Sequence, residues 1–464
     1  MMQELFELAA VDVVDRLRER QVSATEYAQE LIKKCEDQRG LNAFIHFEPD
    51  QVLEQARDAD RKQDSDHILG PLHGIPIAVK DNFDITGYCT TAGTPGLMDH
   101  RVTRTAPVVQ ALIDAGAIIL GKTNMHEMAF GPTSNNVTFG VVRNPVDRNR
   151  IAGGSSGGTA AAIASQMTPL GIGTDTAGSV RVPAALCGLV GLRPTMNSYS
   201  RSGIVPLSKT RDTAGPMARN IADLALLHEV MSGRNVSIVP AKLTGLRVGV
   251  RKDHSYLTDP SVSYVVDKEL HRLRVLGAEC IDVEVNDVED TFINVARPVT
   301  VWEAPEEIER YLQESGSSLA FEVLVDQIVG QDVKPYFQAM KTQKEELAPI
   351  YRQAVDRWIP KLRSTYTRYF QTDGIDVMIY PTTPIPAGVV GEDKLEIVGG
   401  REVWNGHYLL NTTPITLTGM PGLTLPIGRT ALGLPVGLEI VGPRHSDNQL
   451  LSIGLAWEDS RRDY

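Results

Sequence analysis

The sequence lacks several features that would assign it to a specialised class of protein. Its four cysteines form no CxxC pair, so they predict scattered thiols and exclude a disulfide framework or a zinc site. These cysteines are Cys35, Cys89, Cys187 and Cys280. No run reaches the roughly 18 apolar residues of a membrane span. The first 20 residues carry charges throughout and have no apolar signal-peptide segment. These absences predict a cytoplasmic protein with no membrane partner.

Positive charge is not in excess either. The chain has 46 basic and 58 acidic residues, a net charge of -12. An acidic chain has no general attraction for nucleic acid phosphates or anionic lipid, so neither is expected as a partner. Hydrophobic residues make up 42% of the 464 residues and charged residues 22%, which is typical of a globular protein with a large core.

Apolar runs alternate with segments of helical periodicity. This alternation predicts a layered α/β fold around one sheet. Strands are expected at 75–80, 117–120, 243–250, 279–284, 376–384 and 433–442, and helices at 23–36, 51–63, 105–116, 157–165, 261–276 and 446–459. The region from about 285 to 375 differs most in composition, because it is mostly helical, charged and aromatic. We interpret it as an insertion that covers a site.

Residues 116–123, GAIILGKT, match the pattern of a phosphate-binding P-loop. A P-loop needs a strand before its first glycine and a flexible loop between its glycines. Here a predicted helix precedes Gly116, and the intervening AIIL is itself the predicted strand. We therefore interpret the match as accidental and expect no nucleotide there.

Residues 153–157, GGSSG, match the GxSxG pattern of an α/β-hydrolase around Ser155. That motif follows a strand and needs a later acid and a later histidine. The preceding segment is polar and rich in turn residues, and no downstream histidine has the setting of a base. The α/β-hydrolase interpretation is therefore not favoured.

A longer motif starts at the same place. Residues 153–158, GGSSGG, open directly onto an Ala-rich helix, whereas a flexible linker would not continue into a packed helix. A second serine cluster, GTDTAGS, ends at Ser179 about one helix and one strand later. Lys80 ends the apolar run of HGIPIAVKDN, where an ammonium group that reaches water along its stem would be the ordinary interpretation.

These three stretches together resemble the amidase signature family, whose members hydrolyse amides with a Ser–Ser–Lys arrangement. The resemblance implies a single large domain over 1–464, with a central mixed β-sheet flanked by helices and a signature core at about 65–230. It places the lysine at Lys80, the bridging serine after a cis peptide bond at Ser155, and the nucleophile at Ser179. It implies no metal and no cofactor, and it favours a homodimer.

The resemblance also implies which residues surround these three. The oxyanion hole and substrate pocket are expected from Thr176, Ala177, Gly178, Ala129, Phe130 and Gly131. Supporting roles are expected for Ser156, Asp175 and Arg181. Ala177 departs from the glycine that the family usually has at this position, which would matter only if the position requires a positive φ.

The chemistry of these side chains is consistent with the resemblance. A serine hydroxyl needs a base to become a nucleophile, and a lysine can be that base only when neutral. Burial at the end of an apolar strand lowers a lysine pKa, because desolvation disfavours the ammonium. A hydroxyl both donates and accepts, so Ser155 can carry a proton between Ser179 and Lys80.

Stretches such as KTNMHEMAFGPTSNN (122–136) and MPGLTLPIG (420–428) resemble indoleacetamide and mandelamide hydrolases of this family. They predict hydrolysis of a primary arylacetamide, a small-molecule substrate, to an acid and ammonia. Three alternatives stay open: a hydrolase of small urea-derived amides, a hydrolase of peptide C-terminal amides, and the glutaminase subunit of an amidotransferase. A catalytically inactive binding module would require one of the three residues to be replaced, and all three are present.

Overall fold

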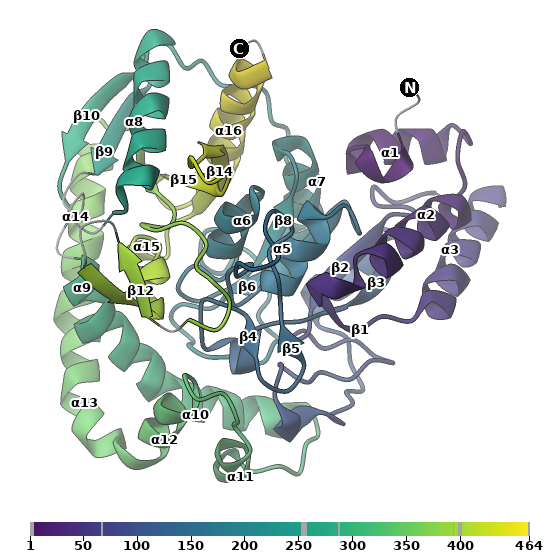
Figure 1. Ribbon diagram of the computed structural model, residues 1–464, viewed down its shortest axis with the longest axis horizontal. Helices are drawn as coiled ribbons and strands as arrows, with labels where there is room; N and C mark the ends of the chain where they lie inside the picture. The colour runs from purple at the N-terminus through teal and green to yellow at the C-terminus, as the bar shows by residue number, and fades with distance from the viewer. Residues whose placement is uncertain are drawn as a thin grey trace.

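The computed structural model describes residues 4–65, 68–251, 258–285, 288–392, 394–397 and 401–462. Within these residues the chain forms one large mixed sheet of 11 strands flanked by helices (Figure 1). In sheet order the strands are β1 (Phe44–His46), β3 (Ile118–Thr123), β2 (Pro76–Lys80), β6 (Leu170–Asp175), β8 (Thr213–Ala218), β7 (Val190–Arg193), β14 (Gly422–Arg429), β15 (Pro435–Val441), β11 (Val377–Pro381), β9 (Arg247–Arg251) and β10 (Glu279–Val283). The predicted α/β fold with a central mixed sheet is confirmed.

Two short ribbons lie outside this sheet. They pair β4 (Asn135–Asn136) with β5 (Gly140–Val141), and β12 (Lys394–Ile397) with β13 (Arg401–Trp404). The helices before residue 288 are α1 (Ala10–Arg18), α2 (Ala24–Asp37), α3 (Pro49–Asp64), α4 (Pro107–Asp114), α5 (Gly157–Ala164), α6 (Arg181–Cys187), α7 (Ile221–Ser232) and α8 (Pro260–Val275). Those after it are α9 (Val288–Thr291), α10 (Arg297–Glu314), α11 (Phe321–Asp326), α12 (Lys334–Thr342), α13 (Lys344–Gln353), α14 (Ile359–Gln371), α15 (Thr413–Thr418) and α16 (Asp447–Arg462).

Local sequence explains several element boundaries. Helix α2 begins with a capping box, in which Ser23 accepts from the amide of Glu26 and the Glu26 carboxylate accepts from the amide of Ser23. Helices α4 and α8 each carry proline in the first turn, where the missing N–H is not needed. Strand β3 includes Gly121 and Lys122, so the P-loop-like pattern is a buried strand and not a loop. All four cysteines are free thiols.

The sheet order places the N-terminal strands at one edge of the sheet and β8, β7 and β14 at its centre. Strands β1, β2 and β3 lie at one end with α2 and α3, and β9 and β10 lie at the other (Figure 1). Strand β7 pairs with β14, which comes more than 200 residues later and joins the C-terminal segments to the same sheet. Among the described helices, none has the length and apolar character of a membrane span.

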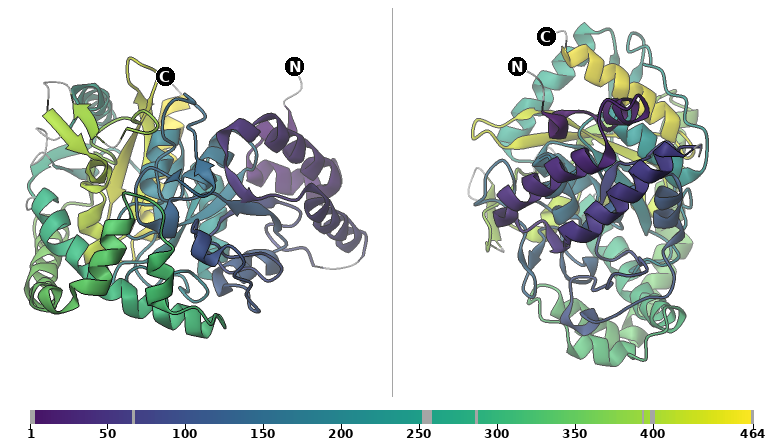
Figure 2. Two further views of the ribbon diagram at one scale, coloured as in Figure 1. Left: turned by 60° about the horizontal axis from the view of Figure 1, so that its bottom comes forward. Right: turned by 90° about the vertical axis from the view of Figure 1, so that its right-hand side faces the viewer.

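Helices α9 to α14 occupy most of the region 285–375, of which residues 286 and 287 lie outside the described residues. They lie along the left side and the lower edge of the molecule in Figure 1, and at the bottom of the right-hand view in Figure 2. Their apolar side chains pack into clusters separate from the main core, one centred on Ile308, Leu324 and Phe337. A π-helical turn, Phe292–Ala296, leads into α10, and such turns often occur at functional sites.

Candidate active site

Lys80 lies at the end of β2, on the edge where the neighbouring parallel strand β6 also ends. Its side chain is fully buried, and its Nζ is 2.7 Å from Ser155 Oγ and 2.8 Å from Thr174 Oγ1. Burial lowers the pKa of Lys80 to about 7, although the nearby carboxylates of Asp175 and Asp212 oppose the shift. A substantial fraction of the amine is therefore neutral near pH 7.

Ser155 follows a cis peptide bond with Gly154, as the resemblance implied. Position 154 has to be glycine, because a Cβ there would lie 2.8 Å from the backbone nitrogens of Thr133 and Ser134. The carbonyl of Ser155 accepts from the amide of His126 at 3.2 Å, which fixes the turn before α5. The cis peptide bond and this backbone contact fix the position of Ser155, whose hydroxyl lies 2.7 Å from Lys80 Nζ.

Ser179 lies in the turn between β6 and α6. Its carbonyl accepts from the amide of Ser156 at 3.2 Å, so the two serine loops touch through their backbones. In the part of the chain that the structure describes, the Ser179 hydroxyl forms no hydrogen bond. Catalytic hydrogen bonds are often absent before substrate binds. Ser156 itself donates through Oγ to the carbonyl of Thr174 at 3.3 Å, a supporting contact at the base of the same turn.

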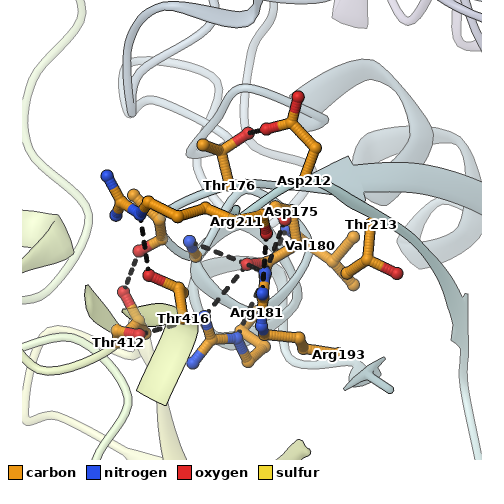
Figure 3. A network of polar contacts seen from close by, with 12 residues as sticks. Asp175, Thr176, Val180, Arg181, Arg193, Arg211, Asp212, Thr213, Thr412 and Thr416 are labelled. Atoms are coloured by element: carbon orange, nitrogen blue, oxygen red, sulfur yellow. Dashed lines mark hydrogen bonds and ion pairs between the residues drawn. The ribbon is translucent and has the colours of Figure 1, made fainter. Parts of the chain in front are cut away.

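The turn before Ser179 is braced by a buried ion network (Figure 3). The carboxylate of Asp175 accepts from Arg181 Nε at 3.0 Å and from Arg193 Nη1 at 2.9 Å. It also accepts from the backbone amides of Gly178 and Val180. Despite its burial, the pKa of Asp175 lies well below the usual range, because the two guanidinium groups favour the charged form. Asp175 and Arg181, for which the resemblance implied supporting roles, are therefore in direct contact.

The geometry narrows the expected oxyanion donors. The amide of Gly178 donates to the carboxylate of Asp175 at 3.0 Å, so in this structure it supports the turn, and its expected role as an oxyanion donor stays a prediction. Within the described residues, the amides of Thr176, Ala177 and Ser179 donate no hydrogen bond. Gly178 instead serves the turn: its φ is 132°, and a Cβ there would lie 2.3 Å from Thr412 Oγ1. Ala177 has no positive φ, so its methyl group causes no strain.

Ser179 opens into a cavity of about 140 Å³. The expected pocket residues Ala129, Phe130 and Gly131 line it together with Thr176 and Ala177. Four aromatic rings line it as well, and they come from distant parts of the chain: Phe130, Phe292, Tyr336 and Trp404. The rings pack in pairs, with centroids 4.9 Å apart for Phe130 and Tyr336 and 5.5 Å apart for Phe292 and Trp404. The lining is mainly apolar.

Two arginines also line this cavity. Arg211 is 2% exposed and donates through Nη1 to Thr300 Oγ1 at 2.7 Å, but its Nη2 has no partner among the described residues. Figure 3 shows the Arg211 guanidinium bonded on one side to Thr416. Arg297 stacks over the ring of Tyr336, 4.7 Å from its centroid. The cavity therefore combines an apolar wall with one buried cationic donor.

Asp332 on the cavity wall is held by His126, whose Nε2 is 3.1 Å from its carboxylate. The neighbouring Glu127 accepts from the amide of Gly330 at 2.6 Å. These contacts tie the loop before α12 to the signature core. Gly131 packs against the same imidazole, because a Cβ at 131 would lie 2.2 Å from the ring of His126.

Several of these residues were not identified from the sequence. Thr174 could have been identified, because it lies two residues before Thr176 and places a hydroxyl near the end of a strand beside Lys80. Phe292, Tyr336 and Trp404 belong to no motif. In the described ranges no three His, Cys, Asp or Glu side chains lie where they could hold a metal ion.

Comparison with known proteins places this geometry in context. The family model described as Amidase matches residues 26–451. An indoleacetamide hydrolase of Agrobacterium vitis is 37% identical over 96% of this chain and 95% of its own. A mandelamide hydrolase of Pseudomonas putida is 34% identical over 97% of this chain and 91% of its own. A solved amidase structure superposes with a TM-score of 0.87 at 30% identity, covering 98% of this chain and 100% of that one.

Proposed function

Because the chain belongs to the amidase family and is an amidohydrolase of C–N bonds other than peptide bonds, we propose that it hydrolyses a primary arylacetamide. Indole-3-acetamide and mandelamide are the candidate substrates, since they are the amides named by the relatives. The products are the arylacetic acid and ammonia. The observation that carries the proposal is the fully buried amine of Lys80, 2.7 Å from Ser155 Oγ.

The reaction starts at Ser179. Ser155 accepts the proton of the Ser179 hydroxyl while it passes its own proton to the neutral amine of Lys80. Ser179 Oγ then bonds to the substrate carbonyl carbon. When the tetrahedral intermediate collapses, Ser155 returns a proton to the nitrogen, so the C–N bond breaks to give ammonia and not an amide anion. Water hydrolyses the resulting ester of Ser179 by the same relay.

The developing oxyanion needs donors that are already in place. The amides of Thr176, Ala177 and Ser179 are suitable, because they belong to one turn and have no other acceptor within the described residues. Asp175 holds this turn through the amides on either side of Ser179. Losing one such donor typically costs about 3 to 4 kcal/mol of transition-state stabilisation.

The cavity beside Ser179 supports an aromatic acyl group. Its four rings offer edge and face contacts to an aryl group, and the region 285–375 supplies two of them, Phe292 and Tyr336. We assign that region the role of covering the acyl group. Without it, the aryl ring would be exposed to water on that side, and the hydrophobic contribution to binding would be lost.

Arg211 favours a second candidate. Its Nη2, which has no partner in the described part of the chain, could donate to a carboxylate on a small urea-derived amide such as allophanate. The two candidates differ in what the cavity must hold, since allophanate has no ring to contact the aromatic side chains. A hydroxyl next to the amide carbonyl, as in mandelamide, would satisfy the same donor and keep the ring contacts.

The test is ammonia release by the purified chain from indole-3-acetamide, mandelamide, phenylacetamide, allophanate and glutamine. The arylacetamides should be hydrolysed with a kcat/KM at least tenfold above that of the others. Preference for allophanate would select the second candidate. Release from glutamine alone, or from no amide in the absence of a partner, would favour an amidotransferase subunit and contradict the proposal.

Variants test the assignment of roles in the same assay. Ser179→Ala should abolish both turnover and labelling by a fluorophosphonate probe. Ser155→Ala should lower kcat by several orders of magnitude. Ser156→Ala is the matched control, because its hydroxyl makes only the long contact to a carbonyl, and it should retain activity within about tenfold. Full labelling of Ser179→Ala would contradict the assignment.

A further inference from the structure

A second cavity, of about 170 Å³, lies on the other side of the wall formed by Ala129, Thr176 and Leu207. We call it the rear chamber. These three residues line both cavities, but the rest of the two linings differ. Ser179 lines only the acyl cavity, whereas Thr174 and Asn82 line only the rear chamber. The rear chamber therefore begins at the hydroxyl that Lys80 contacts.

Two buried acceptors on the rear chamber lack a partner among the described residues. Asn82 is 1% exposed and donates through Nδ2 to Thr174 Oγ1 at 3.1 Å, but its Oδ1 accepts nothing. Glu307 is 2% exposed, and its Oε1 likewise accepts nothing while Oε2 pairs with Arg310. An unsatisfied buried acceptor costs about 1 to 3 kcal/mol. Two of them on one cavity indicate a ligand that donates hydrogen bonds.

We propose that the rear chamber binds ammonium, the leaving group of the amide hydrolysis on which this inference rests. Ammonium has four N–H donors and no acceptor, which is the complement of an unsatisfied acceptor such as Asn82 Oδ1 or Glu307 Oε1. The charges around the chamber comprise three carboxylates, of Asp212, Glu307 and Glu314, and two guanidinium groups, of Arg201 and Arg310. With every carboxylate ionised the balance is one negative charge, and burial raises the pKa of Asp212 toward its neutral form.

The position of the chamber follows from the direction of the reaction. When the C–N bond breaks, its electron pair stays on nitrogen, and Ser155 supplies the proton that completes ammonia. Ser155 and Lys80 lie on the side of Thr174, so the nitrogen departs toward the rear chamber while the acyl group stays beside Ser179. Ammonia that takes a proton from water becomes ammonium and is held by Asn82 and Glu307.

Binding is measured on the wild-type protein without any amide, so the result does not depend on the proposed activity. Ammonium chloride is added at constant ionic strength and the thermal unfolding midpoint is followed, because a ligand of the folded state raises it by mass action. Sodium, potassium and tetramethylammonium chloride are the comparison salts. Ammonium should raise the midpoint in a saturable way, and the other three cations should not.

Glu307→Gln removes a charged acceptor and should weaken ammonium binding by about tenfold or more, since hydrogen bonds to charged groups are the stronger ones. Glu306→Gln is the matched control, because Glu306 is the exposed neighbour on α10 and does not line the chamber. An equal response to potassium, no response to ammonium, or the same loss in Glu306→Gln would overturn the proposal. If the protein binds ammonium but hydrolyses no arylacetamide, the ammonium site is supported and only the proposed function is refuted.

Discussion

The amine of Lys80 and the hydroxyl of Thr174 lie 2.8 Å apart on two neighbouring parallel strands, β2 and β6. A neutral amine has two N–H donors and one lone pair. When one N–H is directed to Thr174, the lone pair can point to Ser155, whose Oγ is 2.7 Å from the same nitrogen. Thr174 thus orients the proposed base.

Thr174→Val should lower kcat/KM by about tenfold, because it removes one hydrogen bond of roughly 1 kcal/mol and the orientation that it gives. The pH profile distinguishes this from a general packing defect. In the wild type, kcat/KM should rise with pH through about 7, where Lys80 becomes neutral. Loss of an acceptor for the ammonium form should move that midpoint to lower pH in Thr174→Val. Thr174→Ser keeps the hydroxyl, so a shifted midpoint in that variant would contradict the role.

Lys80→Met should abolish activity and yet stabilise the fold. In the unfolded chain the lysine pKa is about 10.4, whereas burial lowers the pKa of Lys80 in the folded protein to about 7. The unfolded state therefore binds more protons between these values, and the stability of the wild type rises with pH across this window.

The variant has no such dependence. The unfolding free energy of Lys80→Met should exceed that of the wild type most at pH 7 and below. The difference should be several kcal/mol, reduced by the contribution of the two lost hydrogen bonds, and it should shrink as the pH rises toward 10. Denaturant unfolding at pH 7 and pH 9.5 measures both. A variant that is less stable than the wild type at pH 7 would show that Lys80 is held as a well-compensated ammonium.

The residues of the proposed relay have clearer signals in the sequence than the residues that line the cavity. Lys80, Ser155 and Ser179 each lie in a motif whose composition restricts the local backbone. At position 154, for example, any Cβ would lie 2.8 Å from the backbone nitrogen of Ser134. Trp404 and Tyr336 have no such signature. They reach the cavity because β14 pairs with β7 and because Glu127 and His126 hold the loop before α12, and these contacts join segments about 200 residues apart.

Asp175→Asn should destabilise the protein by about 3 to 5 kcal/mol, because it leaves the buried guanidinium groups of Arg181 and Arg193 without their shared carboxylate. The activity of the folded variant should also fall, because the amides of Gly178 and Val180 lose the carboxylate that holds the turn. Urea unfolding measures the loss of stability, and kcat is measured without urea, well below the unfolding midpoint. Normal kcat in the folded fraction would mean that the network supports the fold but not the oxyanion donors.

Trp404 should contribute to binding of the aryl group and not to the chemistry. Its ring packs 5.5 Å from that of Phe292 at the mouth of the cavity, over Gly406, where a Cβ would lie 1.8 Å from the indole. Trp404→Ala and Gly406→Ala should each raise KM for an arylacetamide by about tenfold, because both remove the indole from this position, while kcat changes little. Trp404→Phe keeps a ring and should lose less.

Acetamide, which has no ring, provides the internal control for these variants, and its kcat/KM should be unchanged. The comparison separates a lost aryl contact from a distorted turn, since damage at Ser179 would slow both substrates alike. If acetamide and arylacetamide turnover fall by the same factor in Trp404→Ala, the indole supports the architecture of the site, and the aryl group has to be bound by Phe130 and Tyr336 on the opposite wall.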